Sequence, residues 1–262
     1  MNTKVMGIVN VTPDSFSDGG QFYRPEQAIR RALNLVEDGA DIIDLGGEST
    51  RPGADPVSWE EEWNRLEPVL RGLSPRFSGT VPVSVDTYHP ETAERAVELG
   101  AMIINCVYAE PVVDMLQICE KSGAELVLPA KTAETVPGRF AGAVPVYLDP
   151  MIGFGTTREE DLALLKSVPG LAKKGRVLVG ASRKRIVKKL TGEKVTGKNV
   201  GGNLGIAVWC AMHGASVVRV HDVKETVQAL RVIAALQCPA GVHTPAEYSG
   251  GEGHRKFGVI CA

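Results

Sequence analysis

The sequence has little cysteine, few aromatic residues and no excess of charge of either sign. Its five cysteines are an odd number, and no two of them are spaced as C-x-x-C: Cys106, Cys119, Cys210, Cys238 and Cys261. This usage indicates neither a disulfide framework nor a zinc site. With 29 basic and 31 acidic residues the formal net charge is −2, so overall charge points to no nucleic-acid or membrane partner.

Long apolar runs are missing as well. No stretch approaches the roughly 18 apolar residues that a membrane-spanning helix needs, and residues 1–5 lack the charged-then-apolar pattern of a signal peptide. We therefore expect a cytoplasmic protein. Its 262 residues suit one large α/β domain or two small ones, and they are enough for a substantial core.

The sequence does contain a repeated alternation of short apolar runs and longer stretches with helical periodicity, which is typical of βα units. Eight runs are expected to be strands, at residues 5–9, 42–45, 81–85, 102–104, 126–128, 144–148, 177–179 and 217–220. Helices are expected at residues 25–37, 59–70, 90–99, 112–121, 159–166, 203–213 and 222–236. Eight strands with helices between them predict an α/β protein with a single (β/α)8 TIM barrel.

Three segments depart from this alternation. Residues 129–143 are barely long enough for a helix and two loops, so we expect a truncated or irregular fifth βα crossover. Residues 191–202, rich in Gly, Lys and Thr, are expected to form a mobile loop. Periodicity ends at residue 238, which predicts a barrel at 1–237 and a non-periodic C-terminal tail at 238–262.

Polar side chains stand at the carboxyl end of almost every expected strand: Asn10, Asp44, Asp86, Asn105, Asp149, Ser182, Lys184, Arg219 and His221. In a barrel, ligands collect at this end. Solvated loops do not usually place carboxylates directly after Val, Ile or Leu runs, so the pattern favours a binding site. Carboxylates and amides in such a site suit a flat, donor-rich heterocycle such as a purine or a pterin.

A second group is basic and hydroxylic: Thr50, Arg51, Arg219 and His221. Guanidinium groups and glycine-rich backbone bind oxyanions, so this group suits a phosphate or pyrophosphate. Thr50 and Arg51 belong to the glycine-rich stretch at residues 46–54, for which a plain turn with a helix-capping hydroxyl is the alternative. The basic Ser182-Arg183-Lys184-Arg185 cluster follows a strand and precedes a possible helix, so it offers a helix N-terminus to an anion. The alternative for this cluster is a solvated surface turn.

Six segments, in order along the chain, together resemble dihydropteroate synthase. They are residues 6–20, residues 46–54, Ser84-Val85-Asp86-Thr87, Asp149-Pro150 with Gly153-Phe154-Gly155, Ser182-Arg183-Lys184 and Arg219-Val220-His221-Asp222. The resemblance implies a pterin-binding barrel that joins 6-hydroxymethyl-7,8-dihydropterin pyrophosphate to p-aminobenzoate and releases pyrophosphate in folate biosynthesis. It also implies Mg²⁺ as a cofactor, a homodimer and a sulfonamide target.

Site roles follow from the resemblance, position by position. The pterin-binding residues would be Asp44, Asp86, Asn105, Asp149, Phe154, Lys184 and Arg219. The pyrophosphate-binding residues would be Asn10, Thr50, Arg51, Arg219 and His221, with Asn10 also meeting Mg²⁺. The p-aminobenzoate pocket would consist of Phe16, Thr50, Pro52 and Ser182. The catalytic residues would be Asp18, Asp86, Lys184, Arg219 and His221.

The middle third of the chain departs from the family pattern. Cys106 stands where the family usually has an aspartate, and Met151 and Thr156 replace a usual glycine and lysine. The fifth strand leads into Pro129-Ala130-Lys131-Thr132 instead of a Met-His-Met type segment. Two alternatives therefore stay open: a pterin-binding homologue without catalysis, and a pterin-dependent methyltransferase. The Thr50-Arg51-Pro52 loop counts against the methyltransferase.

Overall fold

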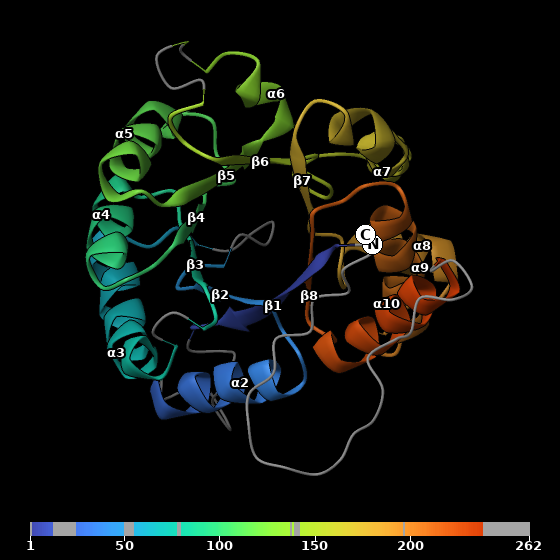
Figure 1. Cartoon of the computed structure of the whole chain (residues 1–262), viewed down its shortest axis with the longest axis horizontal. Coiled ribbons are helices and arrows are strands. Elements are labelled where there is room, and N and C mark those ends of the chain that lie inside the picture. Colours follow the sequence, from blue (N-terminus) through green and yellow to red (C-terminus); the bar gives the residue numbers. More distant parts are fainter. Residues whose placement is uncertain are drawn as a thin grey trace.

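The chain folds as a closed barrel of eight parallel strands surrounded by helices (Figure 1). A computed structural model describes residues 2–12, 25–49, 55–77, 80–136, 138, 142–195 and 197–237. The strands are β1 (Lys4–Asn10), β2 (Ile42–Gly46), β3 (Val83–Asp86), β4 (Ile103–Asn105), β5 (Glu125–Pro129), β6 (Val146–Asp149), β7 (Arg176–Val179) and β8 (Val217–Val220). Each strand pairs with the next, and β8 pairs with β1. The predicted (β/α)8 TIM barrel is confirmed.

Two strands begin two residues later than their apolar runs suggested. The runs at residues 81–85 and 144–148 each contain a proline, and β3 and β6 begin directly after Pro82 and Pro145. A proline has no backbone N–H to donate to a strand ladder. Each proline offers only its carbonyl, which accepts from Ile43 N at 3.1 Å and from Leu126 N at 2.9 Å, respectively.

The helices form the outer ring. They are α2 (Pro25–Glu37), α3 (Trp59–Phe77), α4 (Pro90–Glu98), α5 (Val112–Ser122), α6 (Ala130–Ala133), α7 (Arg158–Ala172), α8 (Arg185–Thr191), α9 (Val200–Met212) and α10 (Val223–Gln237). The α3 helix continues past the predicted end at residue 70, through Pro75, because Leu73 and Phe77 still pack into the core. Residues 191–202 are not one loop, since α8 includes Thr191 and α9 begins at Val200.

The fifth crossover is truncated, as predicted. Its helix α6 has four residues, whereas the helices that follow the first four strands have between nine and 19. In Figure 1 this short helix lies beside β5 and β6, and the ring of long helices resumes with α7. In the part of the chain that the structure describes, no long helix therefore covers the barrel at this position.

The core has two parts. The larger part lies between the strands and the surrounding helices. The smaller part fills the barrel itself and is made of one side chain from each of seven strands: Met6, Ile42, Ile103, Val127, Tyr147, Leu178 and Val217. Among the described residues, no helix is long and apolar enough to cross a membrane. The tail predicted at 238–262 lies outside the described residues.

Candidate active site

Polar side chains gather inside the carboxyl end of the barrel. Five strands supply them: Asp44 from β2, Asp86 from β3, Asn105 from β4, Asp149 from β6 and Arg219 from β8. Asp44, Asn105 and Asp149 are buried, with exposed fractions of 0%, 1% and 6%. Because side chains alternate along a strand, the positions two residues beyond the apolar barrel core face the same way. The sequence predicted all five, and the structure brings them together.

Arg219 is the centre of this group. Its Nε donates to Asp44 Oδ2 at 2.6 Å and its Nη2 to Asp86 Oδ2 at 2.6 Å. Burial alone would lower the pKa of Arg219, but the two carboxylates raise that pKa above its usual value. Asn105 Nδ2 also donates to Asp44 Oδ2, at 3.4 Å. Two buried acceptors, Asp44 Oδ1 and Asn105 Oδ1, find no hydrogen-bond partner in the part of the chain that the structure describes.

Burial shifts the protonation of three of these groups. It raises the pKa of Asp86 to about 7; Arg219 opposes this shift, and Asp44 and Glu62 increase it. Burial also raises the pKa of Asp149, with Lys184 acting in the opposite direction. The same effect lowers the pKa of Lys184 to about 8. The site therefore holds a carboxyl and an amine that both titrate near neutral pH, as acid and base groups of an active site often do.

Lys184 lies between β7 and α8, and contacts with the loop after β6 hold its side chain in the site. Lys184 Nζ donates to the Ile152 carbonyl at 2.7 Å and lies 4.3 Å from the centre of the Phe154 ring. Between those two residues is Gly153, at φ 81°, where an added Cβ would stand 3.0 Å from Lys184 Cδ. Glycine thus allows both the left-handed backbone and the close approach of the lysine.

The capping box of α7 supports this loop. Thr157 Oγ1 accepts from Glu160 N at 3.2 Å, and Glu160 Oε2 accepts from Thr157 N at 2.6 Å. One turn further, the buried Asp161 accepts from Gly153 N at 2.7 Å and from Thr156 Oγ1 at 2.5 Å. The helix start is therefore tied to the loop that carries Ile152 and Phe154.

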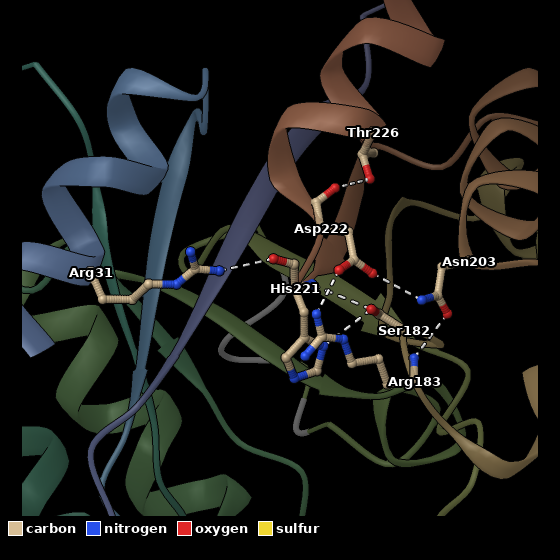
Figure 2. Close-up of polar contacts among 7 residues, drawn as sticks. All are labelled: Arg31, Ser182, Arg183, Asn203, His221, Asp222 and Thr226. Atoms are coloured by element: carbon tan, nitrogen blue, oxygen red, sulfur yellow. Dashed lines mark hydrogen bonds and ion pairs between the residues drawn. The ribbon is translucent and has the colours of Figure 1, made fainter. Parts of the chain in front are cut away.

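Ser182 and His221 lie together at the ends of β7 and β8. Ser182 Oγ is 3.1 Å from His221 Nδ1 and accepts from His221 N at 3.3 Å. Arg31, on α2, donates to the His221 carbonyl at 3.1 Å (Figure 2). The sequence predicted Ser182 and His221 but not Arg31, because a lone arginine in a helix shows no pattern that distinguishes a support from a solvated charge.

Asn10 ends β1, where it is partly buried and in register with Gly46 of β2. The structure thus places this candidate at the same end of the barrel as the carboxylates. Five other predicted site residues lie outside the described residues: Phe16, Asp18, Thr50, Arg51 and Pro52.

On either side of segment 50–54 in the sequence, two glutamates contact the residues that follow β3, and the sequence did not single out either of them. Glu48 accepts from the Tyr88 hydroxyl at 2.9 Å and lies 3.4 Å from His89 Nε2. Glu62, fully buried in the first turn of α3, accepts from Thr87 Oγ1 at 2.6 Å. Burial raises the pKa of Glu62. Sequence reasoning missed Glu62 because acidic residues in the first turn of a helix are normally solvated, and it missed Glu48 because a single acidic residue after a strand is normally solvated as well.

The chain is similar to known proteins over most of its length. A family model described as "Pterin binding enzyme" matches residues 6–144 and 141–221. A dihydropteroate synthase of Neisseria meningitidis serogroup B is 40% identical, with 89% of this chain and 92% of that protein covered. One of Bacillus subtilis is 36% identical, with 92% and 91% covered. The chain belongs to the dihydropteroate synthase family.

Solved structures of the dihydropteroate synthase family share its fold. One from Xanthomonas albilineans, with 4-aminobenzoic acid, has a TM-score of 0.84 and 38% identity, covering 90% of this chain and 93% of its own. Another, in complex with 7,8-dihydropteroate, has a TM-score of 0.80 and 36% identity, with 90% and 94% covered.

The positions that depart from the family pattern have identifiable local effects. Met151 adopts a left-handed backbone at φ 65°, a conformation that favours glycine, while its N–H donates to Asp149 Oδ1 at 2.7 Å. Thr156 uses its hydroxyl within the loop, on Gly153 and Asp161. Cys106 is a buried free thiol, and burial raises its pKa to about 12. A thiol with so high a pKa is not a nucleophile at neutral pH.

Proposed function

We propose that this protein is a dihydropteroate synthase, which joins 6-hydroxymethyl-7,8-dihydropterin pyrophosphate to p-aminobenzoate and releases pyrophosphate in folate biosynthesis. The observation that carries the proposal is the buried polar layer at the open end of the barrel. Asp44 Oδ1 and Asn105 Oδ1 are acceptors without a partner among the described groups. A buried acceptor without a partner costs free energy unless a ligand supplies a donor. The amino and ring N–H groups of a pterin are such donors.

The charges of the layer suit the departure of pyrophosphate. When the C–O bond to pyrophosphate breaks, the carbon attached to the pterin ring is left as a delocalised cation. Asp86 and Asp149 would stabilise that cation, and Arg219 and His221 would bind the departing oxyanion. The amine nitrogen of p-aminobenzoate then forms the new C–N bond and loses a proton to solvent. Ser182, beside His221, would orient p-aminobenzoate, and Phe154 would contact the face of the ring.

Mg²⁺ is part of the proposal as a companion of the pyrophosphate. The described residues contain no group of three His, Cys, Asp or Glu side chains that could hold a metal ion. Mg²⁺ often keeps several waters and binds through substrate phosphates and one or two protein oxygens. The amide oxygen of Asn10 is a donor of this kind, so the residues present fit an ion that arrives with substrate. Bound there, Mg²⁺ would neutralise charge on the leaving oxygens.

A homodimer and a cytoplasmic location complete the proposal. Several large apolar side chains are exposed on α8 to α10 and in the loop between α8 and α9: Leu190, Val195, Met212, Val232 and Leu236. Exposed apolar patches often mark protein interfaces, so a second copy of the chain is the proposed partner of this surface. Sedimentation of the purified protein tests the dimer, and cell fractionation tests the location.

Turnover tests the proposed function directly. The purified protein, incubated with the pterin pyrophosphate, p-aminobenzoate and Mg²⁺, should release pyrophosphate and form dihydropteroate. Lys184→Ala should lower turnover by about 100-fold or more, the usual cost of one preorganised polar group, with a free energy of unfolding within about 1 kcal/mol of the wild type.

The same measurements separate the alternatives. A silent pterin-binding homologue would bind the pterin in calorimetry, give no product at high enzyme concentration, and show no ordered binding of p-aminobenzoate in the presence of pyrophosphate. A pterin-dependent methyltransferase would accept a methylated folate instead. Lys184→Ala protein that fails to fold would count against the assignment of this lysine to the site.

A further inference from the structure

We propose that Arg183, Asn203 and Asp222 are positioning residues that hold the β7 and β8 strand-end loops in a fixed relation to each other. The inference rests on the proposed function, because the side chains that they would aim are Ser182, Lys184 and His221. None of the three was singled out as a ligand-binding residue. They would act through their neighbours in the chain.

Arg183 has an unusual backbone. Its φ of 60° lies in the left-handed region, and among the described residues only Met151 shares this feature without being a glycine. A non-glycine residue there is strained and persists only where the surroundings impose the conformation. Here Arg183 N donates to Asn203 Oδ1 at 3.0 Å. Since Arg183 lies between Ser182 and Lys184, its backbone conformation determines where both neighbours point.

A closed ring of hydrogen bonds fixes this conformation. Asn203, on α9, uses its other amide atom to donate to Asp222 Oδ2 at 2.9 Å. Asp222 Oδ1 accepts from the guanidinium Nη2 of Arg183 at 2.6 Å. Figure 2 shows the three side chains facing one another. Asn203 and the carboxylate of Asp222 are largely shielded, with exposed fractions of 4% and 9%, whereas the Arg183 side chain is 34% exposed. The Asn203–Asp222 side of the ring is therefore shielded from water, and the guanidinium closes the ring from its exposed side.

The ring connects two site loops because Asp222 directly follows His221. With Arg183 held on one side and Asp222 on the other, Ser182 and His221 are brought to within hydrogen-bond distance. A shift of about 1 Å at such groups can lower turnover by about 100-fold. The ring therefore explains why an arginine with a strained backbone stands inside the Ser182-Arg183-Lys184 segment.

An exchange of the two ring partners tests the proposal. In Asn203→Asp alone, two carboxylates face each other, and in Asp222→Asn alone, two amides do. In the double variant, the carboxylate introduced at position 203 accepts from both Arg183 N and the amide introduced at position 222, and that amide accepts from the guanidinium. The full chain of each variant is assayed for kcat and for the KM of p-aminobenzoate, and calorimetry measures binding of inorganic pyrophosphate.

Each single exchange should lower kcat/KM by about tenfold to 100-fold and weaken pyrophosphate binding, and the double exchange should restore both to within about threefold. Singles equal to the wild type, or a double variant no better than the worse single, would overturn the proposal. Thr226→Val is the structural control. Thr226 Oγ1 donates to the Asp222 carbonyl at 2.7 Å outside the ring, so this variant should lose stability while keeping kcat/KM.

Arg183→Gly provides a second variant that keeps the proposal testable if an exchange variant fails to fold. Glycine accepts a φ of 60° without strain and keeps the N–H bond to Asn203, but it removes the ion pair with Asp222. We expect weaker pyrophosphate binding and no loss of folding; unchanged binding would overturn the proposal. Pyrophosphate binding is measured without turnover, so an inactive wild type would refute the proposed function while the exchange experiment still tests the ring.

Discussion

Two neighbouring layers inside the barrel differ sharply in chemistry although the same strands build them. The apolar layer contains Ile42, Ile103, Tyr147 and Val217. Two residues further along each of these strands, the inward position carries a polar side chain: Asp44, Asn105, Asp149 and Arg219. A step of two residues along a strand keeps a side chain on the same face. The side chains that face the barrel interior therefore change from apolar to polar along the barrel axis.

The apolar layer fills the barrel, and it stabilises the fold because its side chains are removed from water on folding. Buried ion pairs are weak evidence for stability, because the cost of desolvating both charges offsets their attraction, and packed apolar residues of similar volume often do better. The polar layer is thus explained by a ligand and the apolar layer by the fold. This difference predicts which substitutions damage activity and which damage stability.

The largest effect is expected for Arg219→Met, which keeps an unbranched side chain as far as the position of Nε and removes the charged guanidinium. Asp44 and Asp86 would then be buried without their cation, which should cost about 3–5 kcal/mol in the free energy of unfolding and lower turnover by at least about 100-fold. Urea unfolding and the pyrophosphate-release assay measure the two losses. Arg219→Lys is the control, since it keeps the charge but not the two-point contact. A stable and active methionine variant would refute the central role of Arg219.

Leu178→Ala tests the apolar layer. Leu178 is fully buried in the barrel core, so its truncation should cost about 2–5 kcal/mol in stability. Because it lies in the apolar layer, kcat/KM at a temperature where the variant is folded should change by no more than a few fold. Met102→Ala, at a side chain that is 54% exposed and lies outside the proposed dimer surface, should cost less than about 0.5 kcal/mol. A Leu178 variant that is stable but inactive would contradict the division between the layers.

The pH dependence of stability should reveal the raised pKa of Asp86. Burial raises its pKa from 3.8 to about 7 in the folded chain, so between pH 4 and pH 7 the folded state binds more protons than the unfolded state. Stability linked to this group is therefore present at low pH and is lost as pH rises through 7, with a slope of at most about 1.4 kcal/mol per pH unit for one proton. Asp86→Asn should reduce the slope by up to this amount; Asp149 and Glu62, whose pKa values burial also raises, contribute the slope that remains. An unchanged slope in urea titrations would assign it to another group.

The smallest effect is expected for Met151→Gly. Relief of the left-handed strain opposes the extra entropy of glycine in the unfolded chain, so stability should stay equal or rise by up to about 1 kcal/mol. The control is Lys173→Gly, at φ −77°, where nothing is relieved and a loss of about 0.5–1 kcal/mol is expected. Thermal unfolding compares the two variants. A clear loss at Met151 would mean that its side chain stabilises the loop over Asp149.

The barrel could be predicted well because the sequence patterns that indicate it are local. Period-3.6 stretches and short apolar runs reflect which faces are buried, and a missing helix shows up as missing length, which is why the short crossover at α6 was visible. The errors were local too: the strand starts at Pro82 and Pro145, the end of α3, and the single loop expected at residues 191–202. The hydrogen-bond ladder determined where these strands begin, and the burial of Phe77 determined where α3 ends. Neither follows from a hydrophobic pattern.

The site was predictable to the extent that its residues stand at strand ends. Asp44, Asp86, Asn105, Asp149 and Arg219 could be placed together because the carboxyl ends of parallel strands meet at one end of a barrel. Arg31, Glu62 and Asn203 could not, since each sits in a helix where the sequence shows an ordinary polar residue. Their partners lie between 19 and 190 residues away along the chain.

The sequence by itself determined the order of strands and helices, the shortened fifth crossover and the polar strand ends, because each is written in neighbouring residues. Only the tertiary structure decided that Arg219 binds two carboxylates, that Asp86 titrates near neutral pH, and that Arg183 is locked by Asn203 and Asp222. These properties depend on burial and on distances between segments far apart in the chain. They arise only when the closed barrel excludes water and sets those distances.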